Sequence, residues 1–115
     1  MAYILNTFVK RYLRDAGQAE ADWRALKANT DYGIALARGA AHDPIQSKIP
    51  AAFRDGGFTA LKDGEGSLVR YVGSPDEESG RLERYRQILE NCLLTVEPME
   101  DPDRPDRRML RVSKP

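Results

Sequence analysis

The sequence contains one cysteine, Cys92, and one histidine, His42, among its 115 residues. A single cysteine excludes a disulfide within the chain and a metal site built from several cysteines. A single histidine likewise excludes a metal site built on a histidine pair. The segment "DGEGS" at 63–67 lacks the lysine and the following helix of a phosphate-binding loop. We therefore expect neither a metal nor a cofactor.

Long apolar runs and an excess of one charge are also missing. No run approaches the roughly 20 apolar residues of a transmembrane helix, and the N-terminus lacks the regions of a signal peptide. The 18 Lys and Arg residues balance 18 Asp and Glu residues, so the formal net charge is zero. Overall charge thus provides no attraction to nucleic acid or to a membrane. Together with the cysteine content, this predicts a soluble cytoplasmic protein without membrane contact.

The chain length predicts one α+β domain with two unlike halves, residues 1–57 and 58–115. Apolar residues at helical spacing predict about three helices in the first half. They cover residues 3–14, 18–28 and 32–41, with a break at "NTD" before the third. Gly33 and Gly39 weaken the prediction of that third helix.

The second half has the pattern of a β-β-α-β-β unit with a small antiparallel sheet. Two short strands flank "DGEG", a hairpin signal with Asp63 and Gly64 at the bend. Ser74 and Glu77 form the pattern of a capping box, and Pro75 suits the first helical position. The predicted strands are 58–62, 67–73, 93–98 and 107–113, and the helix 75–92 lies across one sheet face.

The same patterns predict the core. In the second half we expect it to contain Leu61, Val69, Tyr71, Leu82, Tyr85, Leu89, Leu94, Val96, Leu110 and Val112. In the first half we expect Phe8, Tyr12, Trp23 and Leu36. Cys92 falls on the apolar stripe near the C-terminal end of the helix 75–92, which predicts a buried, unreactive thiol.

The segment "EDPDRPDRR" at 100–108 carries seven charges and two prolines in nine positions. The prolines exclude a helix interior and a central strand, so the segment must connect the last two strands. The simpler interpretation is a solvated connection. The alternative is a semi-rigid binding segment whose restrained arginines lose little entropy when they bind.

The absence of catalytic motifs favours a small non-enzymatic interaction protein that regulates, inhibits or adapts a protein partner. Such proteins are common among phage and mobile-element accessory proteins. Exposed arginines and aromatics dominate interface energies, which predicts two partner-binding surfaces. Their residues are Arg104, Arg107 and Arg108 in the charged segment and Lys10, Arg11 and Arg14 on the first helix.

Two other functions stay open. A DNA- or RNA-binding regulator would use local basic faces, with tyrosines as stacking platforms. The residues of this alternative are Lys10, Arg11, Arg14, Arg84 and Arg86, with Tyr3, Tyr12, Tyr71 and Tyr85 for stacking. A small enzyme would centre on His42 beside Asp43. Acidic residues of the helix 75–92 are explained as capping or solvent-facing charge. A homodimer through an edge strand at 107–112 is compatible with every alternative.

Overall fold

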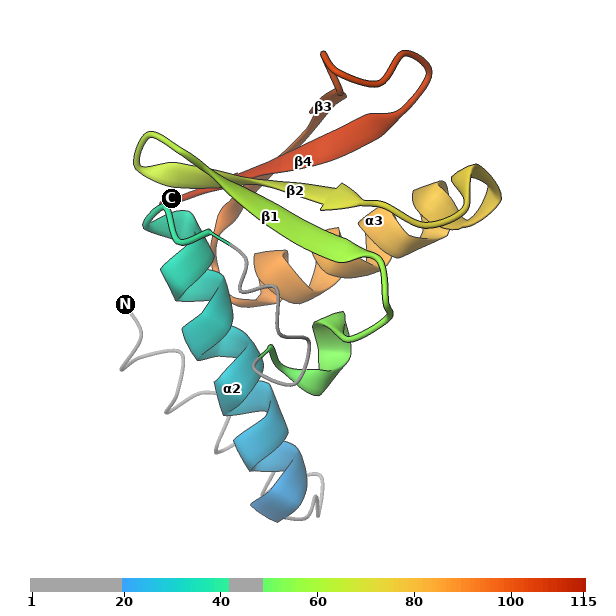
Figure 1. Ribbon diagram of the computed structural model, residues 1–115. Coiled ribbons are helices and arrows are strands. Elements are labelled where there is room, and N and C mark those ends of the chain that lie inside the picture. The colour runs from blue at the N-terminus through green and yellow to red at the C-terminus, as the bar shows by residue number, and fades with distance from the viewer. Residues whose placement is uncertain (1–19, 42–48) are drawn as a thin grey trace.

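The computed structural model describes residues 20–41 and 49–115 (Figure 1). The elements follow the order α2 (Glu20–Ala37), η2 (Ala51–Phe53), β1 (Phe58–Asp63), β2 (Gly66–Tyr71), α3 (Pro75–Asn91), β3 (Thr95–Glu100) and β4 (Arg108–Ser113). The predicted helix 3–14 and His42 lie outside the described residues. Residues 58–113 of the described chain have the predicted β-β-α-β-β order.

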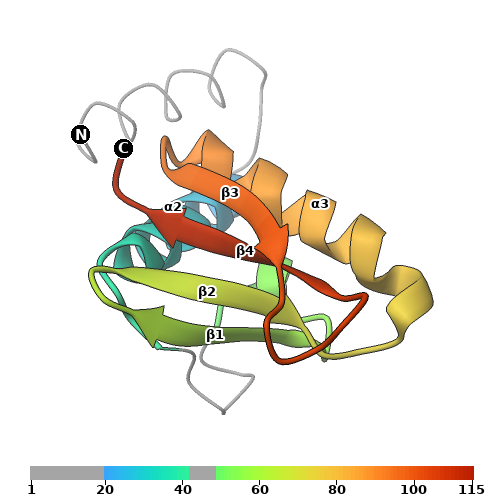
Figure 2. The same ribbon diagram turned by 90° about the horizontal axis from the view of Figure 1, so that it is seen from above.

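The four strands form one antiparallel sheet in the order β1-β2-β4-β3. Because β2 and β3 both run antiparallel to β4, they point the same way, and α3 makes the crossover between them. Both α2 and α3 lie on one face of the sheet (Figures 1 and 2). This confirms the predicted α+β class and a helix across one sheet face.

The position of β4 corrects the predicted route to a homodimer. Residues 107–112 were expected to form an edge strand, but β4 pairs with β2 on one side and β3 on the other. Among the described strands, the two edges are β1 and β3. Pairing of β4 with its copy is therefore excluded by the sheet order.

The β1–β2 hairpin is confirmed. Its register runs from Phe58 opposite Tyr71 to Asp63 opposite Gly66, which leaves Gly64 and Glu65 as the turn. Gly64 has a φ of 58°, in the left-handed region that glycine adopts without strain. The hairpin thus lies where the sequence predicted, but its turn is Gly64-Glu65, one residue later than the predicted bend at Asp63 and Gly64.

The start of α3 is confirmed in position but not in every contact. Ser74 is the N-cap, its hydroxyl accepts a hydrogen bond from the Asp76 backbone N–H at 3.3 Å, and Pro75 begins the helix. The predicted capping box is incomplete, because Glu77 does not reach back to Ser74. Its carboxylate instead accepts a hydrogen bond from the Tyr71 hydroxyl at 2.8 Å.

The predicted break at "NTD" is wrong, since α2 runs unbroken from Glu20 to Ala37. The Thr30 hydroxyl donates to the Leu26 carbonyl oxygen at 3.0 Å, so this side chain bonds along the helix instead of capping a new one. Lys27 and Asp31 form an ion pair one turn apart at 2.8 Å. A Cβ atom at Gly33 would crowd Leu89, so glycine here permits close packing on α3.

The core lies between the sheet and the two helices. Its predicted members Leu36, Val69, Tyr71, Leu82, Tyr85, Leu89, Leu110 and Val112 are buried, while Leu94 and Val96 are partly buried. Leu61 was predicted inside but is 49% exposed, because Phe58 and Ala60 occupy the inward face of β1. The Phe53 and Phe58 rings, which were not predicted, pack with centroids 4.9 Å apart.

Candidate interaction site

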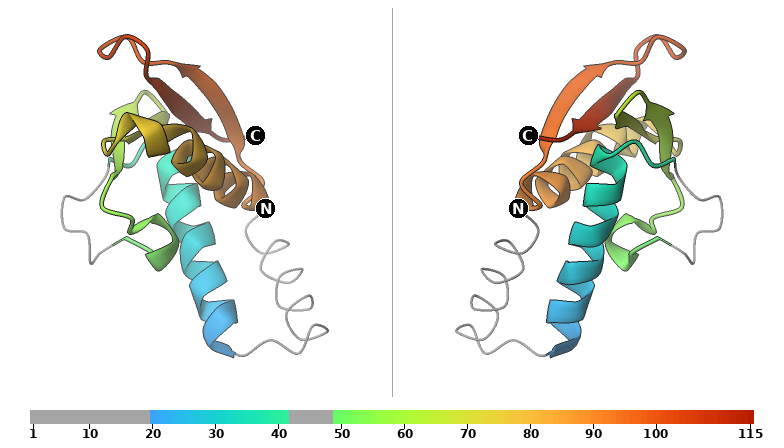
Figure 3. Two further views of the ribbon diagram at one scale, coloured as in Figure 1. Left: turned by 90° about the vertical axis from the view of Figure 1, so that its right-hand side faces the viewer. Right: turned by 90° about the vertical axis from the view of Figure 1, so that its left-hand side faces the viewer.

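The connection between the last two strands is the most unusual surface feature. We call residues 101–107 the β3–β4 loop. It extends with its hairpin beyond the helices (Figure 3). Three of its five charged side chains, those of Asp101, Arg104 and Arg107, are nevertheless largely buried. The Asp101 side chain is fully buried, and those of Arg104 and Arg107 are 23% and 19% exposed. The loop is therefore not a fully solvated connection.

Asp101 holds the first part of this loop. Its Oδ2 accepts a hydrogen bond from Arg104 Nε at 2.7 Å and lies 3.0 Å from Arg70 Nε. Its Oδ1 accepts from the Asp103 backbone N–H at 2.9 Å. Burial opposes ionisation of Asp101, but the Arg104 and Asp103 hydrogen bonds and the Arg70 charge outweigh it and hold the pKa of this carboxyl below its usual range.

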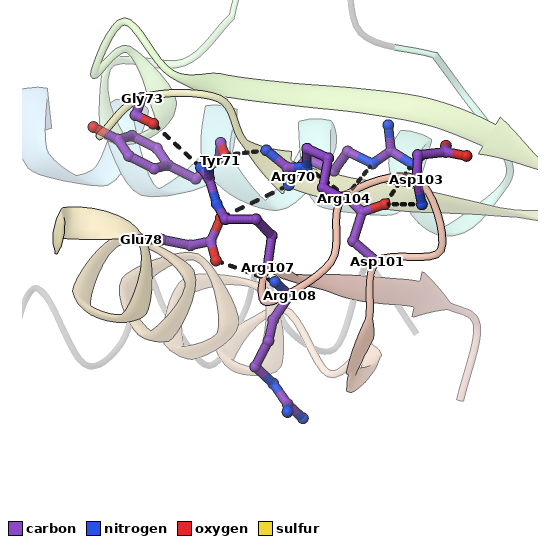
Figure 4. Close-up of polar contacts among 9 residues, drawn as sticks. All are labelled: Arg70, Tyr71, Gly73, Glu78, Asp101, Asp103, Arg104, Arg107 and Arg108. Atoms are coloured by element: carbon purple, nitrogen blue, oxygen red, sulfur yellow. Dashed lines mark hydrogen bonds and ion pairs between the residues drawn. The ribbon is translucent and has the colours of Figure 1, made fainter. Parts of the chain in front are cut away.

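Glu78 in α3 holds the second part. Its Oε1 accepts a hydrogen bond from Arg107 Nε at 2.5 Å, and its Oε2 accepts from the Arg108 backbone N–H at 3.1 Å. Arg104 Nη2 lies 3.7 Å from the same Oε1. The carboxylate thus joins the helix to the end of the loop from both oxygens (Figure 4).

Tyr71, the last residue of β2, connects the loop to the rest of the domain. Its carbonyl oxygen accepts hydrogen bonds from Arg104 Nη1 at 3.0 Å and Arg107 Nη2 at 3.2 Å. Its ring fills the space where a Cβ atom of Gly57 or Gly73 would stand. Strand, loop and helix therefore meet at one buried aromatic residue.

These contacts determine the shape of the loop. Burying a charge costs several kcal/mol of solvation, and only close pairing and hydrogen bonds offset it. Arg70, Arg104 and Arg107 are matched by the carboxylates of Asp101 and Glu78, with the exposed Asp103 bonded to Arg70 at 2.8 Å. A different loop conformation would leave buried charges unpaired. The geometry therefore favours one conformation.

The side chains of the other predicted site residues do not join this buried cluster. Arg108 is exposed, and its side chain points away from the buried cluster (Figure 4). Arg84 is exposed on α3. Arg86 donates to the carboxylates of Glu83 and Glu90, so its charge is balanced. Lys10, Arg11 and Arg14 lie outside the described residues, as His42 does.

Two tyrosines expected to offer stacking faces do not. Tyr71 and Tyr85 are buried in the core, because both rings point from their elements toward the sheet–helix interface. Cys92 is buried as predicted, and that burial raises the pKa of its thiol, with the Thr30 hydrogen bond acting in the opposite direction.

The sequence interpretation overlooked Glu78. It was grouped with helix-capping charge, but its side chain is only 8% exposed and binds the loop. The helical spacing contains the signal, since Glu78 lies four residues before Leu82 on the inward stripe of α3. A carboxylate on such a stripe requires a cationic partner, and the arginine-rich segment supplies one.

Comparisons with protein-family models, with curated proteins and with solved structures found no match to this chain. Within the described ranges, no helix is long and apolar enough to cross a membrane. Nor does that part of the chain contain a group of three or more His, Cys, Asp or Glu side chains that could hold a metal ion.

Proposed function

We propose that this protein is a non-enzymatic interaction protein that regulates, inhibits or adapts a protein partner, and that it binds this partner through the β3–β4 loop and the adjoining Arg108 of β4. The observation that supports the proposal is the internal ion pairing of the loop. Asp101 and Glu78 together bind three arginines, while Pro102 and Pro105 of the loop are exposed to solvent.

The physical argument rests on preorganisation. Ordering a surface loop on binding opposes association, and a loop that is already ordered avoids that loss. Buried ion pairs rarely stabilise a fold more than apolar side chains of similar size would. Their presence at a projecting loop is therefore better explained by a need for a defined shape than by stability alone.

The arginines divide into two roles in this proposal. Arg104 and Arg107 hold the loop through Asp101, Glu78 and the Tyr71 carbonyl oxygen, so they position the surface. Arg108 contacts the partner, because its side chain is exposed and directed outward. A second contact surface is predicted from the sequence at Lys10, Arg11 and Arg14. The proposal also includes a cytoplasmic location.

The experiment is affinity capture of binding proteins from a lysate of the native host. It is repeated with nuclease and at high salt, with wild-type, Arg108→Glu and Arg84→Glu chains as bait. We expect a protein that resists nuclease, is lost with Arg108→Glu and is retained with Arg84→Glu, the matched charge reversal on α3. Equal capture by both variants would contradict the assignment of Arg108.

Two outcomes would support other functions. Recovery of nucleic acid that is released by salt would favour the DNA- or RNA-binding alternative, because phosphate contacts weaken steeply with salt. Capture of no macromolecule would contradict the proposal and direct attention to His42 and small ligands. The double reversal of Arg104 and Arg107 is unsuitable as bait, because loss of their buried ion pairs would also disturb the loop.

A further inference from the structure

A groove of about 370 Å³ lies between the N-terminal half of α3 and the β3–β4 hairpin. We call it the α3–hairpin groove. Apolar side chains line its inner part: Leu82 of α3, Pro98 of β3 and Leu110 of β4. Ser79 contributes a small side chain from α3. Leu82 and Leu110 are only 6% and 2% exposed and form its floor, whereas Pro75 and Pro98 are exposed and provide the accessible apolar surface.

Some charged side chains along this groove already have ion-pair partners, and others do not. Glu83 and Arg86 bind each other, and Glu78 is bonded to Arg107 and to the Arg108 backbone. Asp106 and Arg108 also line the groove, and neither side chain makes an ion pair or hydrogen bond with a described residue. As far as the described residues show, the groove therefore presents one anion and one cation without partners beside an apolar surface.

The backbone at Asp106 supports a built feature at this position. Asp106 has a φ of 68°, a backbone angle that residues other than glycine, asparagine and aspartate rarely adopt. Asp106 directly precedes the ion-paired Arg107 in the sequence, and it lines the groove. The neighbouring Arg107–Glu78 pair fixes the backbone from which the Asp106 and Arg108 side chains project.

The edge strand beside the groove limits how a partner can bind. Pro98 lies in β3, which is an edge among the described strands, and proline has no N–H to donate to an added strand. A proline on an edge opposes strand addition. Binding through side chains inserted between α3 and the hairpin avoids this limit.

We propose that the α3–hairpin groove binds a peptide segment of a partner protein that carries an apolar, an acidic and a basic residue close together. The apolar side chain packs on Pro98 above the floor formed by Leu82 and Leu110, the acidic residue pairs with Arg108, and the basic residue pairs with Asp106. This inference rests on the proposed function as a protein-binding module. It specifies the chemistry of the bound segment.

The test selects binders from a display library of random short peptides, using the full chain as target. We expect enriched peptides to carry an apolar residue together with an acidic and a basic one. Arg108→Glu should replace the acidic preference by a basic one, because the charge at that side of the groove is reversed. Asp106→Asn keeps a residue that tolerates positive φ and should remove the basic preference.

A matched pair of variants tests the location. Ser79→Tyr fills the groove from an exposed helix position, whereas Gln87→Tyr adds the same ring on α3 away from the groove. Measured by fluorescence anisotropy with the best enriched peptide, Ser79→Tyr should weaken binding by about tenfold or more, and Gln87→Tyr by less than about twofold. Circular dichroism of both variants checks that each is folded.

The failures of the two proposals can be told apart. No enriched peptide, a different consensus, or equal affinities of the Ser79→Tyr and Gln87→Tyr variants would overturn the groove assignment. A lysate protein captured equally by both variants would overturn it as well, while leaving the proposed function intact. A wild-type dimer that Ser79→Tyr converts to a monomer in light scattering would identify a second copy of the chain as the occupant and would also overturn it.

Discussion

Glu78 and Arg107 are 29 positions apart in the chain, yet Arg107 Nε donates to Glu78 Oε1 at 2.5 Å. Both side chains are mostly buried, and the same carboxylate also accepts the Arg108 backbone N–H. This pair attaches the first turns of α3 to the end of the β3–β4 loop. The shape of the loop therefore depends on a residue of the helix.

Replacement of Glu78 by glutamine should destabilise the fold. The amide would leave the Arg107 guanidinium without its charge partner in a largely buried position. Breaking a fully buried pair costs about 3–5 kcal/mol, and because Arg107 retains some exposure we expect about 2–3 kcal/mol. Urea unfolding followed by circular dichroism measures the change.

Glu83→Gln is the control for that measurement, because Glu83 bonds to Arg86 on the exposed side of the same helix. Its midpoint of unfolding should stay close to that of the wild type. Equal losses of stability in the two variants would show that the Glu78–Arg107 pair stabilises the fold no more than the exposed Glu83–Arg86 pair does.

The lowered pKa of Asp101 predicts that the free energy of unfolding depends on pH in the acid range. Its pKa is lowered in the folded state, so its contribution is present above the pKa of the unfolded chain, about 4, and is lost as pH falls through the folded value. Asp101→Asn should therefore be less stable than wild type at neutral pH, and the difference should shrink in acid. Unfolding midpoints across this pH range measure the effect, and a constant difference would contradict it.

Tyr85 predicts a loss of stability in alkali. Burial, and secondly the hydrogen bond that its hydroxyl donates to Asp55, raise the pKa of Tyr85 well above its usual range. The folded state keeps this proton after the unfolded chain has lost its own, so stability falls as pH rises above about 10. Tyr85→Phe should be less stable at neutral pH and should show a weaker alkaline loss in thermal unfolding scans.

Alanine substitutions at two glycines should change the stability of the fold in opposite directions. A Cβ atom at Gly66 would collide with the Val112 carbonyl oxygen across the sheet, and backbone cannot move aside easily. We expect Gly66→Ala to cost about 1–3 kcal/mol. Gly80 in α3 has open space at its Cβ position, so Gly80→Ala should stabilise by about 0.5–1 kcal/mol. Chemical denaturation of both variants tests the pair.

Local signals predicted much of the sheet half. Gly64 marks the first hairpin, and Ser74 with Pro75 marks the start of α3, because turns and caps depend on residues close in sequence. Errors arose where distant contacts decide. The break at "NTD" was predicted from local propensity, but Gly33 packs on the distant α3, and Thr30 bonds to Leu26 within a continuous α2. Leu61 was misplaced because a shift of one residue reverses a strand face.

The site was less predictable than the fold. The charged segment was recognised as a surface connection, and Arg108 is exposed as expected. Nothing in the neighbouring sequence shows that Arg104 and Arg107 turn inward, because two of their partners, Glu78 and the Tyr71 carbonyl oxygen, belong to α3 and β2. Composition alone gives the number of charges and leaves open which of them are neutralised internally.

The position of Tyr71 has a consequence for how the molecule opens. Its carbonyl oxygen holds the loop, its hydroxyl holds Glu77 at the start of α3, and its ring is enclosed by Gly57 and Gly73. Loss of this one side chain's packing would release all of these contacts together. Amide hydrogens of the loop and of the first turns of α3 should therefore exchange with solvent deuterium as one cooperative unit.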